Sequence, residues 1–419
     1  MRILWILNMV LPNVANTLKL RTSVSGGWLV DYANKLAHDK NVEIATMTYA
    51  NVPNFMCADA NGIKNYIFPG GGKRLLFSSK KTIADCKYVL NDFKPDIIHI
   101  HGTEYSIGAS MIKTGTDVPI VLTIQGILSR ISQEYYGGLS SSTIFKIGKL
   151  SEWLKLKTTF FAKKLFEKNA KRERFVLNNV KYVTGRTTWD KATMLAINNK
   201  LEYKRFNYNL RQEFYVNKVW DSNNHNKHVI YTGAASYPLK GLHILIQALK
   251  IIKEKYPDVK LIIPGHNPRT SKPNGYEKYI LKMIKKLGLQ SNVEYIGNIK
   301  AAQVVDKLLE SSVCVVPSAI EGASATLCEA MKLGVPCVCS YRGGMTDLFI
   351  DGQTGFYYDF LEYPVLATKV IELFENKSLC EQFSKLSMEQ ANIRHQRDDN
   401  YKQLISIYNE VLGDNKNEQ

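Results

Sequence analysis

The chain has 419 residues, of which 45% are hydrophobic and 22% charged, and its formal net charge is +17. This composition excludes an intrinsically disordered chain, and no apolar run approaches the roughly 20 residues that span a bilayer. The length suits two α/β domains, and the charge fits an anionic partner: a nucleic acid, a membrane surface or an anionic substrate.

The N-terminal stretch MRILWILNMVLPN is predicted to be a buried first strand. It resembles a secretory signal peptide, but Asn8 and Pro12 interrupt its apolar run and no small-residue cleavage site follows. The seven cysteines lack the spacing of a disulfide framework, and four of them lie in apolar runs: Cys314, Cys328, Cys337 and Cys339. We interpret these as packed thiols in a reducing compartment, so a cytoplasmic protein is expected.

The first half alternates between short apolar runs and amphipathic segments. The predicted strands are 3–7, 42–47, 96–100, 119–124 and 181–184, and helices such as 28–37 and 83–93 lie between them. Strands that alternate with helices predict a parallel, doubly wound sheet. We assign residues 1–210 to this Rossmann-like domain.

Residues 145–175 hold ten Lys or Arg against three Glu. Their apolar residues recur at helical spacing, with two further aromatic residues nearby: Ile147, Leu150, Leu154, Phe161 and Leu165, with Trp153 and Phe160. One interpretation is a helix that lies on an anionic membrane. The other is a solvated crossover helix whose lysine stems cover apolar surface. The pattern favours neither.

An asparagine-rich linker, about 205–228, precedes a second strand–helix series. Its predicted strands are 228–232, 259–263, 293–296, 313–316 and 335–339, with helices at 242–253, 276–287, 301–309 and 325–333. We assign residues 211–395 to a second Rossmann-like domain, and we expect the last helix, about 398–412, to pack back on the first. Two such sheets facing a cleft would place the carboxyl ends of their strands at a ligand site.

The stretch PSAIEGASATLCEAMKLGVPCVCS carries two glutamates around a small, uncharged run. Glu321 is predicted in a strand-to-helix loop, Ser324 as the helix N-cap and Glu329 on the second turn. A helix N-terminus favours a phosphate, and flanking carboxylates suit the hydroxyls at both ends of a nucleoside diphosphate sugar. An isolated pair of this kind would more often be a loop carboxylate and a solvated helix residue.

This stretch and its continuation closely resemble the Glu-x7-Glu donor signature of family 4 glycosyltransferases, which have the GT-B fold. The likeness also covers GLHILIQALKIIKEKYPDVKLIIPG, NVEYIGNI and GGMTDLFIDGQTGF. The resemblance implies an α/β GT-B chain with two Rossmann-like domains facing a cleft. It also implies a retaining transfer from a nucleoside diphosphate sugar to a glycan or lipid-linked acceptor in surface polysaccharide synthesis. We expect a cytoplasmic enzyme, at the inner face of the membrane if the basic segment 145–175 binds lipid.

The same resemblance implies roles for particular residues. Glu329 would bind the ribose, Glu321 would hold the donor sugar near its anomeric carbon, and Lys240 would neutralise the diphosphate. Further donor-binding positions are Gly233, Gly322, Ser324, Ala325, Thr326, Asn298 and Ile299, and Gly26 and Gly27 resemble the glycine loop near the diphosphate or acceptor. The chain has no D-x-D, C-x-x-C or H-E-x-x-H motif, so no metal or cofactor is expected.

Two positions depart from the family pattern. Ala234 stands where the family often has Arg, and we expect Arg186 to be a substitute or else a surface residue. Gln125, kept as a catalytic candidate, stands where many relatives have His and can hydrogen-bond a sugar but not carry a proton. His101 and Glu104 are weaker site candidates, whereas His99 is expected in the core.

These departures leave two alternatives open: a sugar-nucleotide-binding partner subunit without turnover, or a GT-B-like sugar-nucleotide epimerase. A dehydrogenase is poorly supported, because no G-x-G-x-x-G follows the first strand. Nucleic-acid binding would rest on charge alone, so it is not expected.

Overall fold

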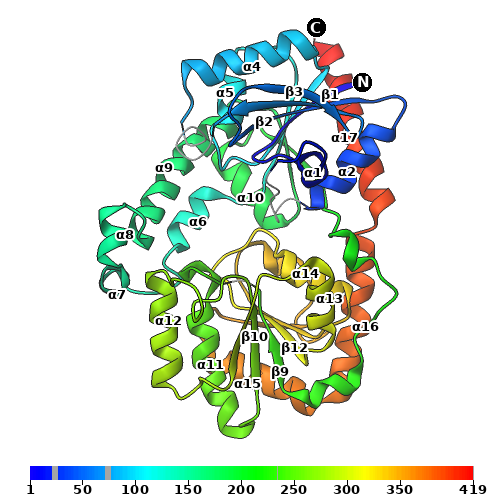
Figure 1. Cartoon of the computed structure of the whole chain (residues 1–419). Coiled ribbons are helices and arrows are strands. Elements are labelled where there is room, and N and C mark those ends of the chain that lie inside the picture. The colour runs from blue at the N-terminus through cyan, green and yellow to red at the C-terminus, as the bar shows by residue number, and fades with distance from the viewer. Residues whose placement is uncertain (21–26, 71–76, 234, 419) are drawn as a thin grey trace. The chain divides into compact units, whose positions relative to one another are not determined.

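A computed structural model describes residues 1–20, 27–70, 77–233 and 235–418 (Figure 1). Contacts divide the chain into two compact units. Unit 1 comprises Met1–Ser129, Glu167–Asn209 and His395–Gln419, and unit 2 comprises Arg130–Phe166 and Leu210–Arg394. Each unit is built on its own sheet, which confirms the prediction of two parallel-sheet α/β domains. Gly26 and Ala234 lie outside the described residues.

Among the described residues, the sheet of unit 1 has eight strands in the order β3-β4-β2-β1-β5-β6-β7-β8. Their bounds are β1 (Arg2–Ile6), β2 (Glu43–Ala50), β3 (Met56–Ala60), β4 (Ile63–Pro69), β5 (Ile97–His101), β6 (Ile120–Thr123), β7 (Tyr182–Gly185) and β8 (Glu202–Arg205). The β3–β4 pair is antiparallel and the other neighbours are parallel.

The β3–β4 hairpin was not predicted from the sequence. Asn61 and Gly62 connect its strands, with φ of 55° and 71°. Left-handed φ at both central residues is typical of the tight turn that Asn-Gly favours between paired strands. The dipeptide was therefore a usable hairpin signal that the sequence analysis overlooked.

Helices cover both faces of the unit 1 sheet. They are α1 (Pro12–Thr17), α2 (Gly27–His38), α4 (Lys80–Phe93), α5 (Ile107–Ile112), α9 (Thr159–Leu177), α10 (Thr188–Ile197) and α17 (Arg397–Glu418). Along β1, Ile3 and Trp5 point into one apolar cluster while Leu4 and Ile6 point into the other, as strand geometry requires. Residues of α4, α5, α9 and α10 pack in the cluster that contains Leu4 and Ile6, and residues of α2 and α17 pack in the cluster that contains Ile3 and Trp5.

The last helix, α17, belongs to unit 1 by its contacts. Tyr408 is fully buried, and its hydroxyl accepts a hydrogen bond from the Trp5 indole N–H at 3.0 Å. The same hydroxyl lies 2.6 Å from Nδ1 of His99, whose other nitrogen lies 2.6 Å from the Thr123 hydroxyl. His99 is therefore a core residue, as expected, and burial lowers its pKa to about 3.

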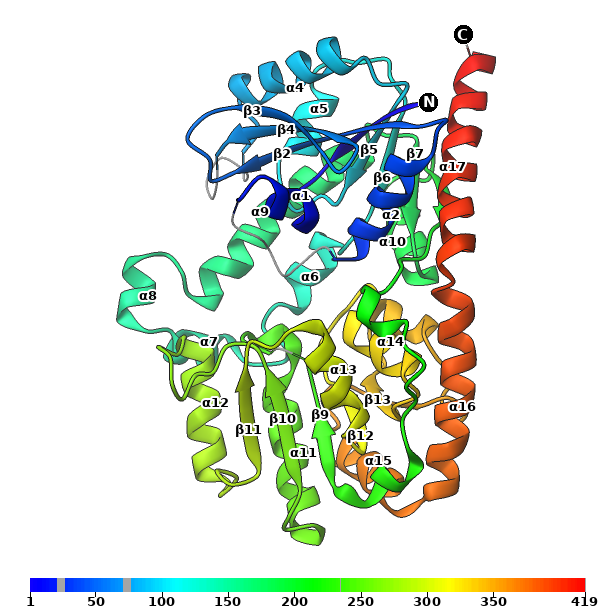
Figure 2. The same cartoon turned by 45° about the vertical axis from the view of Figure 1, so that its right-hand side comes forward.

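In the described part of unit 2, the sheet has six parallel strands in the order β11-β10-β9-β12-β13-β14. Its elements are β9 (Val229–Tyr231), η3 (Pro238–Lys240), α11 (Leu242–Lys255), β10 (Lys260–Pro264), α12 (Gly275–Lys286), β11 (Val293–Gly297), α13 (Ala301–Leu309), β12 (Val313–Val316), α14 (Ala325–Lys332), β13 (Cys337–Ser340), β14 (Phe356–Tyr358), α15 (Tyr363–Glu375) and α16 (Lys377–Arg394) (Figure 2). The strand order reverses between β9 and β12. Ligands of open α/β sheets bind beyond the carboxyl ends of strands at such a switch point.

One segment of the first 210 residues lies in unit 2, which differs from the predicted division. Residues 130–166 include most of α6 (Leu128–Glu134), α7 (Ser141–Ile147), α8 (Leu150–Leu154) and the start of α9. The Gly137 carbonyl accepts a hydrogen bond from the buried His243 ring at 2.8 Å, and Glu152 accepts one from the Gly275 amide at 3.0 Å. Local sequence patterns do not indicate such contacts between distant residues.

The predicted continuous helix over 145–175 is also broken. Gly148 ends α7, and Leu156, with a left-handed φ of 53°, separates α8 from α9. In the described part of the chain, no helix combines the length and the apolar character needed to cross a bilayer.

Candidate functional site

The loops after β9 and β12 meet at the switch point of unit 2 and enclose a pocket. Its lining residues are Thr232, Gly233, Ala235, Lys240, Val316, Pro317, Ser318, Glu321, Ser324 and Thr326. The pocket brings together five residues that the sequence analysis named: Gly233, Lys240, Glu321, Ser324 and Thr326.

Glycine at 241 allows the two loops to approach each other. Gly241 has φ +67°, and a Cβ there would overlap the carbonyl oxygen of Pro317. The neighbouring Ala319 amide donates to the Leu239 carbonyl at 2.7 Å, which ties the β12 loop to η3. This contact holds the η3 turn, and hence Lys240, against the loop that carries Glu321.

Lys240 and Glu321 form an ion pair inside the pocket. The Ser318 hydroxyl donates to the same Glu321 oxygen at 3.0 Å, and the Gly344 amide donates to the Glu321 carbonyl at 2.8 Å. Burial alone would lower the pKa of Lys240, but the Glu321 carboxylate more than offsets it, so the net pKa is raised. The pocket therefore contains a fixed ammonium group at neutral pH.

The N-terminus of α14 forms another wall of the pocket. Ser324 caps this helix, because its side chain accepts a hydrogen bond from the Leu327 amide at 3.3 Å. The first-turn amides of Ala325 and Thr326 have no partner within the helix by its geometry. Gly233 packs so closely that a Cβ there would lie 2.8 Å from Oγ1 of Thr326. Gly322 lies in the loop just before the cap.

Glu329 is buried on the same helix, and its partner is an arginine that the sequence analysis missed. Arg211 Nε and a terminal nitrogen donate to its two oxygens at 2.7 and 2.8 Å. Burial raises the pKa of Glu329, and Arg211 partly opposes this rise. The alternative of a solvated helix residue is therefore wrong for Glu329. Arg211 lay in the predicted linker, where no pattern connected it with position 329.

A smaller pocket lies beside α12, and it shares Ala235 with the first. Its other lining residues are Ser236, Leu242, Ile263, Pro264, His266, Glu277, Ile280 and Tyr295. His266 pairs with Glu277 at 2.8 Å, and Tyr295 precedes Gly297 at the end of β11. The predicted residues Asn298 and Ile299 follow that strand end but do not line either pocket.

The remaining predicted residues form a separate cluster at the strand ends of unit 1. A terminal nitrogen of Arg186 donates to the Gln125 carbonyl at 2.9 Å, and the Gln125 amide donates to the His101 carbonyl at 3.3 Å. Arg186 is half-buried, with its guanidinium 4.0 Å from the centre of the Tyr208 ring. It is therefore packed into this cluster and is not an isolated surface residue.

His101 is the last residue of β5 and Glu104 lies in the loop that follows, and burial shifts the pKa of both side chains. The His101 ring packs against Trp5, His99 and Trp28, and burial lowers its pKa well below the usual range. Its ring nitrogens have no hydrogen-bond partner among the described residues. Burial raises the pKa of Glu104 to about 7. Gly27, the last of these candidates, is the first residue of α2.

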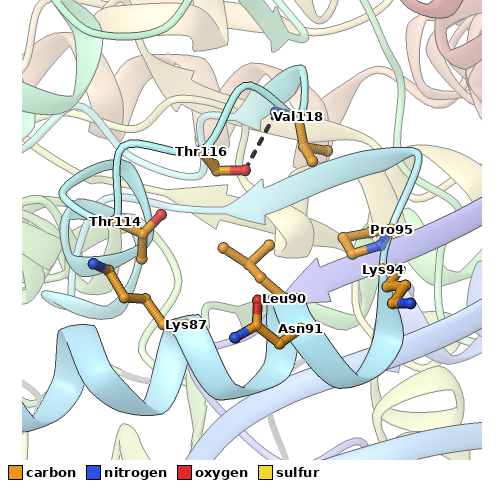
Figure 3. Close-up of a pocket in the computed structure, with 8 residues that line it drawn as sticks. All are labelled: Lys87, Leu90, Asn91, Lys94, Pro95, Thr114, Thr116 and Val118. Carbon is orange, nitrogen blue, oxygen red and sulfur yellow. Dashed lines mark hydrogen bonds between the residues drawn. The ribbon is translucent and has the colours of Figure 1, made fainter.

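A further hollow in unit 1 contains none of the predicted site residues (Figure 3). It is lined by Lys87, Leu90, Asn91, Lys94, Pro95, Thr114, Thr116 and Val118. These residues lie on α4, on the turn before β5 and on the segment before β6, so the hollow lies away from the carboxyl ends of those strands. Within the described residues, no group of three or more His, Cys, Asp or Glu is arranged to hold a metal ion.

Part of unit 2 is similar to a family of known proteins. Residues 216–390 match the model of the glycosyl transferases group 1 family. N-acetyl-alpha-D-glucosaminyl L-malate synthase of Bacillus anthracis is 27% identical over 43% of this chain and 44% of its own length. A capsular polysaccharide biosynthesis glycosyltransferase of Staphylococcus aureus is 27% identical over 41% and 43%. These matches therefore span less than half of each relative.

Other similarities extend over most of the chain. An uncharacterized glycosyltransferase of Methanocaldococcus jannaschii is 23% identical over 84% of this chain and 86% of its own length. Sucrose-phosphate synthase of Thermosynechococcus elongatus has a TM-score of 0.74 at 14% identity, covering 98% of this chain and 99% of its own. Anabaena HepE in complex with UDP and glucose has a TM-score of 0.67 at 17% identity, covering 98% and 100%. Residues 216–390 are therefore similar to the glycosyl transferases group 1, and the chain has the GT-B fold.

Proposed function

We propose that the chain is a retaining, metal-independent glycosyltransferase that moves a sugar from a nucleoside diphosphate sugar to a glycan or lipid-linked acceptor in surface polysaccharide synthesis. The observation that carries the proposal is the switch-point pocket of unit 2. There a lysine, a glutamate and a helix N-terminus converge, with a second buried glutamate on the same helix.

The pocket suits a diphosphate leaving group. Breaking the sugar–phosphate bond builds negative charge on the diphosphate oxygens. The Lys240 ammonium and the amides at the start of α14 are positioned before the reaction, so they stabilise this charge without reorganising. In the structure Lys240 pairs with Glu321. We propose that the Lys240 ammonium pairs with the diphosphate instead when the donor binds.

Glu329 and Glu321 are proposed to bind opposite ends of the donor. A carboxylate offers about four acceptor positions, and Arg211 occupies two of those on Glu329, so two remain for a ribose diol. We propose that Glu321 holds the sugar near its anomeric carbon, where the Ser318 hydroxyl helps to fix the carboxylate. The backbone at the end of β11, near Gly297 and Asn298, is proposed to hold the base.

We assign the acceptor to the strand-end cluster of unit 1, which contains Gln125, Arg186, His101 and Glu104. Support for a surface glycan comes from the capsular polysaccharide relative, and support for a UDP-linked donor comes from the HepE complex. We further propose that the enzyme works in the cytoplasm at the inner membrane face, without metal or cofactor and without nucleic acid.

Nucleotide binding and turnover together test the proposal. The purified protein is screened by thermal shift against UDP, GDP, ADP and dTDP, because a ligand of the folded state raises the apparent stability. Turnover of the matching sugar nucleotides is then measured with and without EDTA, and NMR determines the anomeric configuration of the product. We expect one nucleotide to raise the melting temperature, and turnover that EDTA leaves intact.

Lys250→Ala on α11 provides a matched control for Lys240→Ala, because Lys250 pairs with Glu254 on the helix surface. Only Lys240→Ala should lose turnover. A strict need for Mg²⁺ or Mn²⁺ would contradict the metal-free mechanism, and an inverted product would contradict retention. If no nucleotide stabilises the protein, the function itself is wrong.

A further inference from the structure

Residues 145–160 of unit 2 carry an unusual set of exposed apolar side chains, which we call the apolar tip: Phe145, Leu150, Leu154, Leu156 and Phe160. Leu150, Leu154 and Leu156 are 76%, 79% and 64% exposed. In both views α7 lies beside one end of α12, and α8 extends beyond it (Figures 1 and 2). Contiguous exposed apolar surface on a soluble fold marks an interaction site more often than scattered single residues do.

The tip is folded rather than loose. The Trp153 ring packs against Phe145, Phe160 and Phe161, with centroid distances of 4.8, 6.0 and 5.6 Å. Glu152 accepts a hydrogen bond from the Gly275 amide at the start of α12 at 3.0 Å. The aromatic contacts and this anchor hold the leucines outward on a fixed scaffold.

Leu156 shows local backbone strain at the same place. Its φ of 53° lies in the left-handed region, which a bulky L-residue rarely adopts. Strain of this kind persists where the surrounding structure enforces it, and it clusters at functional sites. Here it coincides with an exposed leucine between two lysines, Lys155 and Lys157.

The charge around the tip is almost entirely positive. Residues 141–166 contain six lysines, no arginine and one acidic residue, Glu152. Glu152 is engaged with the Gly275 amide, whereas Lys146, Lys155, Lys157 and Lys164 are exposed. The exposed face therefore combines positive charge with aliphatic side chains.

This combination identifies the kind of partner. A nucleic acid would attract the lysines but would gain no binding free energy from exposed leucines, and the segment lacks arginine, whose guanidinium binds phosphate in a bidentate geometry. The boundary between headgroups and acyl chains of an anionic bilayer accepts both groups, because leucines insert while lysines remain at the charged surface.

We propose that the apolar tip docks the protein on the anionic face of a lipid bilayer, with Leu150, Leu154 and Leu156 entering the headgroup boundary. Docking does not depend on the transfer reaction. It is connected with the proposed function because a lipid-linked acceptor would be located at the same membrane face.

Two charged residues of the basic segment beyond the tip, Arg172 and Glu173, are engaged within unit 1. Arg172 donates to the backbone carbonyls of Thr103 and Glu104. The fully buried Glu173 accepts hydrogen bonds from the Leu128 and Ser129 amides at 2.8 and 3.1 Å. Part of the positive run that suggested one long membrane helix thus builds the interior of unit 1.

The test is sedimentation of the full chain with vesicles. Vesicles of phosphatidylcholine with one quarter phosphatidylglycerol are compared with pure phosphatidylcholine, at low and high salt. Each lysine near an anionic surface contributes on the order of fivefold in affinity, so Lys146→Gln, Lys155→Gln and Lys157→Gln combined should weaken binding about a hundredfold at low salt. Leu150→Ser, Leu154→Ser and Leu156→Ser combined should weaken it at least tenfold at either salt concentration.

A charge-matched control separates the tip from overall charge. Lys80→Gln, Lys81→Gln and Lys87→Gln remove the same charge from exposed positions on α4 and should leave vesicle binding nearly unchanged. Equal weakening by the α4 set would overturn the proposal, as would wild-type protein that ignores the anionic vesicles at low salt. Wild-type dimers that the leucine variant converts to monomers would mean that the tip binds another copy of the chain. Thermal shift with nucleotide on each variant shows whether the fold and the donor site are intact.

Discussion

Replacing Arg211 with Met would leave the Glu329 carboxylate buried without its cation. In the structure the guanidinium donates to both carboxylate oxygens at 2.7 and 2.8 Å. The Glu329 side chain is 8% exposed and that of Arg211 is 31% exposed. The substitution therefore removes two charge-assisted hydrogen bonds from a site that water barely reaches.

The magnitude follows from the burial of the pair. Removing one partner of a buried ion pair typically costs 3–5 kcal/mol, because the remaining charge stays desolvated. Arg211 is partly open to solvent, so we expect a loss of about 2–3 kcal/mol in the free energy of unfolding. The surface pair of Lys218 and Asp306, at 3.4 Å and with both side chains more than half exposed, provides the control. Lys218→Met should cost less than about 1 kcal/mol.

The loss should depend on pH with a definite sign. Burial already raises the pKa of Glu329, and Arg211 lowers it, so Arg211→Met raises it further. A carboxyl whose pKa is higher in the folded state stabilises the fold below its unfolded pKa and loses that contribution as pH rises through its folded pKa. The deficit of Arg211→Met relative to wild type should therefore grow from pH 5 to pH 8.

Urea unfolding of a double-mutant cycle with Glu329→Gln measures the coupling directly. The double variant should be less destabilised than the sum of the single variants, and Arg211→Lys should recover part of the stability. Additive losses, or an Arg211→Met deficit that is the same at pH 5 and pH 8, would refute the reasoning.

Three further predictions concern the loops and the unit 1 cluster. Lys240→Ala should lower turnover far more than donor affinity, because the diphosphate charge grows toward the transition state; steady-state kinetics and nucleotide titration separate the two effects. Gly241→Ala should cost at least about 2 kcal/mol in urea unfolding, since a Cβ would overlap the Pro317 carbonyl at a positive φ. Gly352→Ala, at φ +71° with open space around it, should cost about half as much, and equal costs would exclude the overlap as the cause. Glu104→Gln should flatten the fall in stability between pH 4.5 and about 7, because burial raises the Glu104 pKa to about 7 and its stabilising contribution disappears as pH rises through that value; an unchanged pH profile of the melting temperature would contradict it.

The sequence predicted those features that depend on local pattern. Alternating apolar runs and helical periodicity were enough for the central parallel strands of both sheets but not for the edge strands β8 and β14, and the Ser324 cap placed Glu321 and Glu329 on either side of a helix start. The Asn61-Gly62 hairpin carried a readable signal that was missed. The donor-site positions followed from the family resemblance, and the structure brings Gly233, Lys240, Glu321, Ser324 and Thr326 to one pocket.

Other features depend on contacts between distant residues. The pairing of Arg211 with Glu329 joins positions 118 residues apart, and nothing in the linker composition indicates it. Residues 130–166 join unit 2 through single hydrogen bonds such as that from the His243 ring to the Gly137 carbonyl, which leave no periodic trace. The basic run at 145–175 looked like one helix because apolar spacing alone cannot show that Arg172 and Glu173 point into unit 1 while Leu154 and Leu156 face solvent.

The central claim is that Glu329 binds the ribose of a nucleoside diphosphate whose phosphates lie at Lys240 and the α14 N-terminus. Calorimetric titration of wild-type protein and Glu329→Ala with the nucleoside diphosphate that stabilises the protein most, and with the matching nucleoside, tests it most directly. A hydrogen bond to a charged group contributes about 1.5–3 kcal/mol, so Glu329→Ala should bind the diphosphate at least tenfold more weakly while remaining folded, and the nucleoside alone should bind poorly to both proteins. Equal affinity of a folded Glu329→Ala protein, or a nucleoside that binds as tightly as its diphosphate, would contradict the account.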